Sequence, residues 1–310
     1  MINRFVFALL LSACAPSFAG ETVQPPNRFA VTLVAAERFE FGATLVERYG
    51  QRGRPLILIP GLASGPWAWQ EAARTLMQDH TVYVLTLPGF DGRPAVKDKA
   101  MAAAQDSLRE LIETRKLRKP VLIGHSLGGT MSLSMAAQHP DLVGGVVSLD
   151  GLPLMPGTED WPVAERVKMA GSLAARMPAG TQASFAAQQQ QYMRVMGVTD
   201  MARADELAKL SGKSDPVAVS KYMVDGLSID LRSALPAIKV PVLVMSPFFD
   251  VDAAQMQMTQ EAKTEYYRAL MKGTPNVKVV SISPARHFAM IDQPEMVNDA
   301  IVEYLKGLPK

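Results

Sequence analysis

The chain has 310 residues, 48% of them hydrophobic and 20% charged, and a formal net charge of +2 at pH 7. This composition predicts a globular protein with a sizeable core, and the near-balanced charge argues against nucleic acid or a strongly acidic partner. No Cys/His cluster has zinc-ligand spacing and no glycine-rich phosphate loop occurs, so we expect neither a metal ion nor an organic cofactor.

The N-terminus predicts an export signal. Residues 1–19 place a basic Arg4 before an apolar run from Phe5 to Leu11 and end in small residues, with cleavage expected after Ala19. A membrane span needs about 20 apolar residues, and this run is shorter. The single cysteine offers an alternative, because the sequence before Cys14 resembles a bacterial lipobox, in which case a lipid on Cys14 would be the only membrane attachment. Both interpretations predict a periplasmic or secreted protein without an internal disulfide.

After this segment, the pattern of apolar residues predicts an α/β fold. Residues 29–41 and 43–49 read as antiparallel strands, and from Leu56 strands and helices alternate, which is typical of a mostly parallel central sheet flanked by helices. Residues 152–226 form a helical stretch rich in Ala, Gln and Met. We therefore predict a core of residues 29–151 and 227–310, interrupted by a helical cap at 152–226.

The most informative motif is Gly124-His125-Ser126-Leu127-Gly128, between a predicted strand at 121–123 and a segment of small residues. A serine at the tip of a tight strand–turn–helix elbow has strained backbone angles and crowded neighbours, which explains the flanking glycines. The following helix directs its free N–H groups and positive dipole end toward the same point. This arrangement predicts that Ser126 is a nucleophile.

A serine hydroxyl requires a base, usually a histidine held by a carboxylate. Of the four histidines, His125 adjoins the serine and should point away from it, while His80 and His139 lie too far from the elbow. His287 follows the predicted strand 277–282, at the edge of the sheet where α/β enzymes place their sites. We predict His287 as the base.

The acid is expected between the serine and the histidine in the chain. Asp250 is the preferred candidate because it follows the predicted strand 242–245 through a short turn. Asp150, at the end of the predicted strand 145–149, and Asp252 are the alternatives. The acid would fix the tautomer of the imidazole and stabilise the imidazolium.

At this point the chain resembles the α/β-hydrolase family, in particular its esterase and lipase branch, from about Pro55 to Leu305. Besides the elbow and the His287 segment, the resemblance includes three landmarks in the expected order: Ile59-Pro60-Gly61-Leu62, Leu87-Pro88-Gly89-Phe90-Asp91 and Pro241-Val242-Leu243-Val244. It implies an oxyanion hole formed by the backbone N–H groups of Leu62 and Leu127. Pro60 is a departure, since many members have histidine there.

These residues predict an exported serine hydrolase that cleaves small-molecule carboxylic esters of short to medium acyl length through an acyl-enzyme. Lipase, thioesterase, lactonase or carbon–carbon bond hydrolase chemistry remains an alternative, as does a non-catalytic binding protein on the same fold. Trp67 and Trp69, just after the predicted oxyanion loop, are candidates for the pocket wall. The sequence leaves the natural ester open, because a triad does not determine pocket shape. It leaves the oligomeric state open as well.

Overall fold

The computed structural model describes residues 26–176, 181–255 and 257–309. The predicted signal peptide and Cys14 lie outside these residues, so export remains a prediction. Within the described ranges, no helix combines the length and the apolar character needed to cross a membrane.

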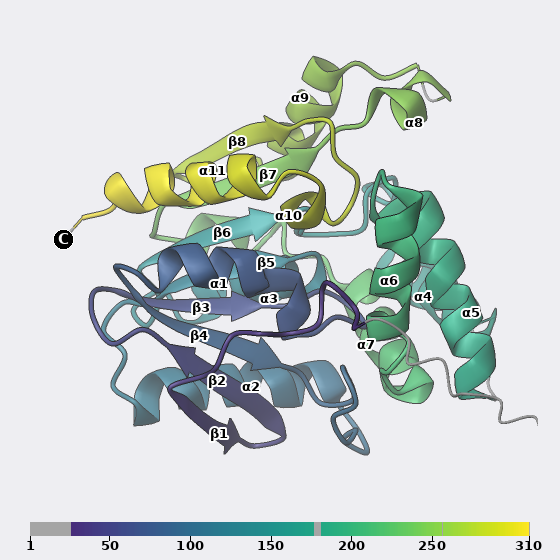
Figure 1. Cartoon of the computed structure of the whole chain (residues 1–310). Coiled ribbons are helices and arrows are strands. Elements are labelled where there is room, and N and C mark those ends of the chain that lie inside the picture. The colour runs from purple at the N-terminus through teal and green to yellow at the C-terminus, as the bar shows by residue number, and fades with distance from the viewer. Residues whose placement is uncertain (1–25, 177–180, 256, 310) are drawn as a thin grey trace, which may run out of the picture.

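The core of the molecule is a single eight-stranded sheet with the strand order β1-β2-β4-β3-β5-β6-β7-β8 (Figure 1). Strand β2 pairs antiparallel with both β1 and β4, whereas β3 to β8 run parallel to one another. The strand bounds are β1 (Glu37–Phe41), β2 (Thr44–Tyr49), β3 (Pro55–Ile59), β4 (Thr81–Thr86), β5 (Val121–His125), β6 (Gly145–Leu149), β7 (Val242–Pro247) and β8 (Val277–Ile282).

The first strand is shorter than the sequence predicts. It begins at Glu37 rather than at Phe29, because β2 ends at Tyr49 and the residues before Ala36 have no strand with which to pair. Val34 is accordingly 91% exposed. The Thr32 side chain instead hydrogen-bonds to Gln70 of α1 over 3.0 Å.

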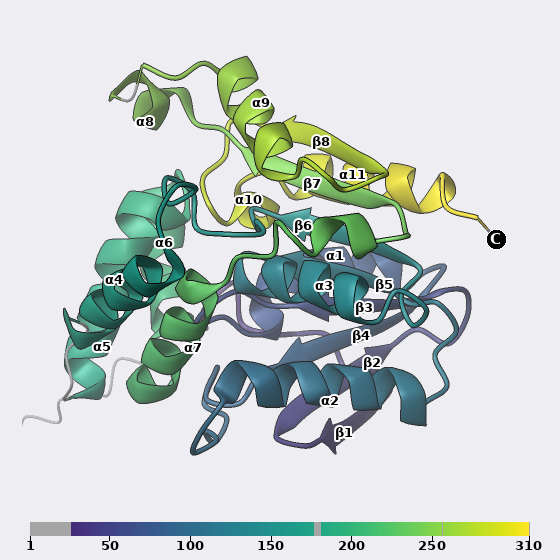
Figure 2. The same cartoon turned by 180° about the vertical axis from the view of Figure 1, so that it is seen from behind.

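Helices cover both faces of the sheet (Figures 1 and 2). Alternate strand residues face opposite sides, so that Ile57 packs in one buried cluster with α2, α3 and α9, and Leu58 packs in the other with α1 and α11. The helices outside the insertion are α1 (Gln70–Leu76), α2 (Ala100–Thr114), α3 (Leu127–Gln138), α8 (Asp250–Gln255), α9 (Gln260–Leu270), α10 (Ala289–Asp292) and α11 (Pro294–Lys306), with 3₁₀ helices at Pro66–Trp69 and Leu235–Ala237.

A helical insertion separates β6 from β7. It consists of α4 (Val163–Arg176), α5 (Gln182–Tyr192), a π-helix (Met193–Gly197), α6 (Met201–Ser211) and α7 (Pro216–Ser228). Figures 1 and 2 place these helices beyond the carboxyl ends of the parallel strands, which is the edge where α/β folds bind ligands.

Candidate active site

Ser126 stands on a strained elbow between β5 and α3. Its backbone angles are φ +52° and ψ −119°, a conformation that costs free energy for a residue with a side chain. Glycine is required on both sides: a Cβ at Gly124 would lie 2.1 Å from the Gly128 carbonyl oxygen, and one at Gly128 would lie 2.4 Å from the Ile59 carbonyl oxygen. The motif therefore folds as its sequence predicts.

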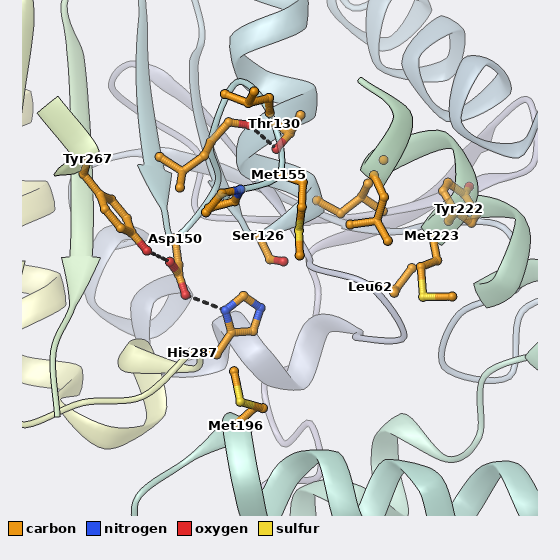
Figure 3. Close-up of a pocket in the computed structure, with 16 residues that line it drawn as sticks. Leu62, Ser126, Thr130, Asp150, Met155, Met196, Tyr222, Met223, Tyr267 and His287 are labelled. Atoms are coloured by element: carbon orange, nitrogen blue, oxygen red, sulfur yellow. Dashed lines mark hydrogen bonds and ion pairs between the residues drawn. The ribbon is translucent and has the colours of Figure 1, made fainter. Parts of the chain in front are cut away.

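His287 and Asp150 form a close pair beside Ser126. The Nδ1 atom of His287 lies 2.5 Å from Oδ2 of Asp150, and both side chains are largely buried. Figure 3 shows the Ser126 hydroxyl and the His287 ring facing the same hollow. Ser126 and Asp150 directly follow β5 and β6, and His287 lies in the loop after β8; the parallel sheet brings these three strand ends to one edge.

The surroundings of Asp150 favour its ionised form. Burial alone would raise the pKa of this carboxyl, but the charge of His287, the hydrogen bond to His287, the Lys263 ammonium and the Tyr267 hydroxyl together hold the pKa below its usual range. Asp150 can therefore serve as a negative partner for a histidine that takes up a proton.

The sequence predicts Asp250 as the partner of His287, but in the structure that partner is Asp150. Asp250 is exposed at the start of α8, where its carboxylate accepts a hydrogen bond from its neighbour's backbone, Val251 N–H, over 2.9 Å. Asp252, the other alternative, forms a two-bond ion pair with Arg286 at 2.7 and 2.8 Å. Asp150 occupies the position at His287.

The paths of the two strands explain this outcome. Strand β7 continues to Pro247, and Phe248 then exchanges backbone hydrogen bonds with Ile282 at the end of β8 and with Ala285 in the segment between β8 and His287. Asp250 follows only after these contacts, as the first residue of α8. Strand β6 ends one residue before Asp150, which turns back at once with φ +53°. Gly151 allows this turn, because a Cβ there would lie 2.5 Å from the Ser126 carbonyl oxygen.

The site also contains a residue that sequence reasoning missed. The Tyr267 hydroxyl on α9 donates a hydrogen bond to Oδ1 of Asp150, the oxygen that does not face His287. The sequence around Tyr267 contains no motif that would have indicated this role, since its contact with β6 depends on how α9 packs against the sheet.

The three side chains line a hollow of about 330 Å³. Leu62 and Leu127, the predicted oxyanion residues, are part of its wall, and Leu127 is the first residue of α3, so its N–H has no acceptor within the helix. The described lining contains no Lys, Arg or Glu, and Asp150 is its one acidic residue. The remaining lining residues are Thr130, Leu152, Leu154, Met155, Pro156, Met196, Tyr222, Met223, Gly226, Leu227 and Tyr267.

The prediction that Trp67 and Trp69 wall the pocket is wrong for this hollow. Neither tryptophan is in its lining. Trp69 is completely buried and donates its Nε1–H to the Ile59 carbonyl over 3.1 Å, while Trp67 stacks on Phe288 with ring centres 5.8 Å apart. Both pack in the core beneath the site, because the 3₁₀ helix Pro66–Trp69 turns its side chains inward.

Comparison with known proteins agrees with this fold. A family profile described as the alpha/beta hydrolase fold matches residues 54–294. The chain belongs to the α/β-hydrolase family.

Its relatives include esterases and other hydrolases. The chain is 27% identical over 196 residues to the pimeloyl-[acyl-carrier protein] methyl ester esterase of Vibrio cholerae, covering 62% of this chain and 74% of that protein. It is 30% identical over 223 residues to the 2-(acetamidomethylene)succinate hydrolase of Mesorhizobium japonicum, covering 70% and 74%. The structure of a thermophilic esterase from Thermogutta terrifontis superposes with a TM-score of 0.70 at 23% identity, covering 87% of this chain and 98% of that one. At that identity, the structural likeness supports the fold alone.

Proposed function

We propose that this protein is a serine hydrolase that cleaves carboxylic esters through an acyl-enzyme. The observation that carries the proposal is the convergence of Ser126, His287 and Asp150 at one hollow, with the His287–Asp150 pair at 2.5 Å. The relative named as a methyl ester esterase supports ester chemistry.

The proposed reaction follows from the placement of these groups. The Ser126 hydroxyl attacks the ester carbonyl carbon while Nε2 of His287 accepts its proton, and Asp150 stabilises the resulting imidazolium through Nδ1–H. The oxyanion receives hydrogen bonds from the N–H groups of Leu62 and Leu127, each typically contributing about 3 kcal/mol. His287 returns the proton to the departing alcohol. Water then attacks the acyl-enzyme by the same route and releases the acid.

The volume of the hollow is an argument for a substrate of limited size. Its volume of about 330 Å³ lies near the lower end of the range for ligand pockets, roughly 300–1,000 Å³. We propose that the helical insertion acts as a cap over Ser126, because Met196, Tyr222 and Met223 of the insertion contribute to the lining. A capped pocket of this size suits short to medium acyl chains. We also propose that the protein is exported, and the signal-peptide pattern of residues 1–19 is the one observation behind this proposal.

A labelling experiment tests the proposed nucleophile. A fluorophosphonate probe should modify the wild-type protein at Ser126, and Ser126→Ala should lose both the label and hydrolysis of p-nitrophenyl butyrate while keeping its melting temperature. The matched control is Ser132→Ala, since Ser132 lies on α3, is fully buried and binds the Gly128 carbonyl. Full hydrolysis by Ser126→Ala would contradict the proposal, and thioester and lactone substrates in the same assay would show which acyl donor is preferred.

A further inference from the structure

The carboxylate of Asp150 is held from two sides. Its Oδ2 faces Nδ1 of His287 at 2.5 Å, while its Oδ1 accepts a hydrogen bond from the hydroxyl of Tyr267. A carboxylate with only one partner can rotate about its Cβ–Cγ bond. Two donors from opposite sides fix the plane of the carboxylate, and with it the direction in which Oδ2 meets the imidazole (Figure 3).

Tyr267 is itself firmly placed. It is 5% exposed, on α9, in the buried cluster that covers one face of the sheet. Burial, followed by the charge of Asp150, raises the pKa of the Tyr267 hydroxyl well above its usual value. The hydroxyl therefore stays protonated and can act as a donor to Asp150 over the whole working range of an esterase.

Other titratable groups also face this carboxylate. Lys263, one turn before Tyr267 on α9, has its ammonium 5.8 Å from the centre of the Tyr267 ring, and its charge acts on Asp150. His125 at the end of β5 and Tyr192 at the end of α5 also interact electrostatically with Asp150. Of the groups named here, Tyr267 and His287 are the two that hydrogen-bond directly to the Asp150 carboxylate.

We propose that Tyr267 is a positioning residue that acts through Asp150 on His287, so that the site works as a chain Tyr267–Asp150–His287–Ser126. The catalytic part of this inference rests on the proposed function; the positioning of Asp150 does not. The donor disperses part of the carboxylate charge away from His287 and keeps Oδ2 in line with Nδ1–H.

Removal of the hydroxyl has two distinct consequences. The carboxylate gains freedom to rotate, which lowers kcat because His287 is less well oriented. Its charge is also no longer shared with Tyr267, so it holds the imidazolium more strongly. The acidic limb of the profile of kcat/KM against pH therefore moves to higher pH, an effect that a purely structural role for Tyr267 would not produce.

The test compares Tyr267→Phe with Tyr266→Phe. The control is well matched, because the neighbouring Tyr266 also donates its hydroxyl to a carboxylate, that of Glu159, away from the hollow. We expect Tyr267→Phe to lower kcat roughly 10- to 100-fold, as for loss of one hydrogen bond to a charged group. The acidic limb should move up by about half a pH unit. Tyr266→Phe should change neither.

Two further measurements keep the inference falsifiable. Asp150→Asn combined with Tyr267→Phe should be no slower than Asp150→Asn alone, because Tyr267 acts only through that carboxylate. The low-field proton resonance of the His287–Asp150 hydrogen bond should shift in Tyr267→Phe and stay in place in Tyr266→Phe. This readout does not depend on ester hydrolysis, so it separates failure of the positioning role from failure of the proposed function. An unmoved resonance and pH profile, or additive losses in the double variant, would overturn the inference.

Discussion

His125 donates a hydrogen bond from Nε2 to the backbone carbonyl of His287 over 2.9 Å, and the two rings pack with their centres 4.6 Å apart. His125 is completely buried. Burial, and then the charge of His287, hold its pKa well below the usual value for histidine. The His125 ring is thus a neutral donor that fixes the segment carrying His287, as expected for a side chain that points away from Ser126.

This arrangement makes stability depend on pH. Because the pKa of His125 is lowered in the folded state, the unfolded chain takes up a proton below pH 6.5 while the folded chain does not. The free energy of unfolding should therefore fall as pH decreases below 6.5, by up to about 1.4 kcal/mol per pH unit from this residue. His125→Gln removes the titration and keeps an amide donor, so its loss of stability between pH 6.5 and 5 should be smaller. Urea unfolding at several pH values measures the difference, and equal slopes in the two proteins would contradict it.

Substitution of the two aspartates provides the second prediction. Asp150→Asn should lower kcat by a factor on the order of 10⁴, because the asparagine amide favours the wrong tautomer of the base. Asp250→Asn should leave kcat nearly unchanged, since Asp250 is exposed and binds only its own helix terminus. Steady-state hydrolysis of one p-nitrophenyl ester by both variants decides the matter. A large loss in Asp250→Asn with little loss in Asp150→Asn would reverse the assignment.

The difference between these two aspartates shows what the sequence could and could not predict. Strand β8 has the bounds that the sequence predicts. Ser126 and His287 are candidates on sequence alone, because a tight elbow and a strand end leave strong local patterns. The choice of acid depends on tertiary structure. Strands β6 and β7 are neighbours and both are followed by an aspartate, so the order of residues favours neither.

The decision rests on contacts between residues distant in the chain. Phe248, before Asp250, hydrogen-bonds to the backbone of Ile282 at the end of β8. Gly151, after Asp150, packs against the Ser126 elbow. The same limit applies to Trp67, which the sequence predicts as part of the pocket wall from its place after the predicted oxyanion loop. Its stacking on Phe288, more than 200 residues later, is not visible in a local pattern.

A third prediction concerns Asp292, which ties the helical insertion to the His287 segment. Its carboxylate accepts hydrogen bonds from the Thr199 N–H, the Thr199 hydroxyl and the Arg286 N–H at 2.9–3.0 Å. In the same region, the His287 N–H donates to the Met196 carbonyl of the π-helix over 3.1 Å. This end of the insertion is thereby fixed against the segment that carries His287.

Asp292→Ala should therefore affect stability and catalysis together. We expect the free energy of unfolding to fall by about 3 kcal/mol, because buried donors lose a charged acceptor, and kcat to fall while KM changes little. Asp299→Ala is the matched control, since Asp299 is exposed on α11, and its effect should stay within about 0.5 kcal/mol. Denaturant unfolding and steady-state kinetics on the same preparations measure both effects. Full activity in Asp292→Ala would show that the hydrogen bonds of Asp292 do not position His287.

The size of the hollow gives a fourth prediction. Each buried methylene contributes roughly 0.8 kcal/mol until the acyl chain reaches the end of the pocket. For p-nitrophenyl esters, kcat/KM should rise from acetate to a maximum at short or medium length and then fall. Met223 lies on the side of the hollow away from Asp150 (Figure 3), so Met223→Trp should move the maximum to shorter chains. Met201→Trp, at an exposed position outside the lining, should not. Palmitate as the best substrate would instead indicate a lid that moves.

The charge of the lining gives the fifth prediction. Among its described residues no Lys or Arg is present, and Asp150 already contributes a negative charge. An acyl chain that ends in a carboxylate would have to lose its hydration without gaining a cationic partner, which costs several kcal/mol. The p-nitrophenyl ester of hexanoate should thus be preferred over the mono-p-nitrophenyl ester of adipate, which has the same chain length, by at least about 100-fold in kcat/KM. Met223→Lys would supply the missing cation. It should narrow this ratio, because kcat/KM should rise for the adipate ester and fall for the hexanoate ester. Equal rates for the two esters in the wild-type protein would mean that the chain end lies in water, outside the hollow.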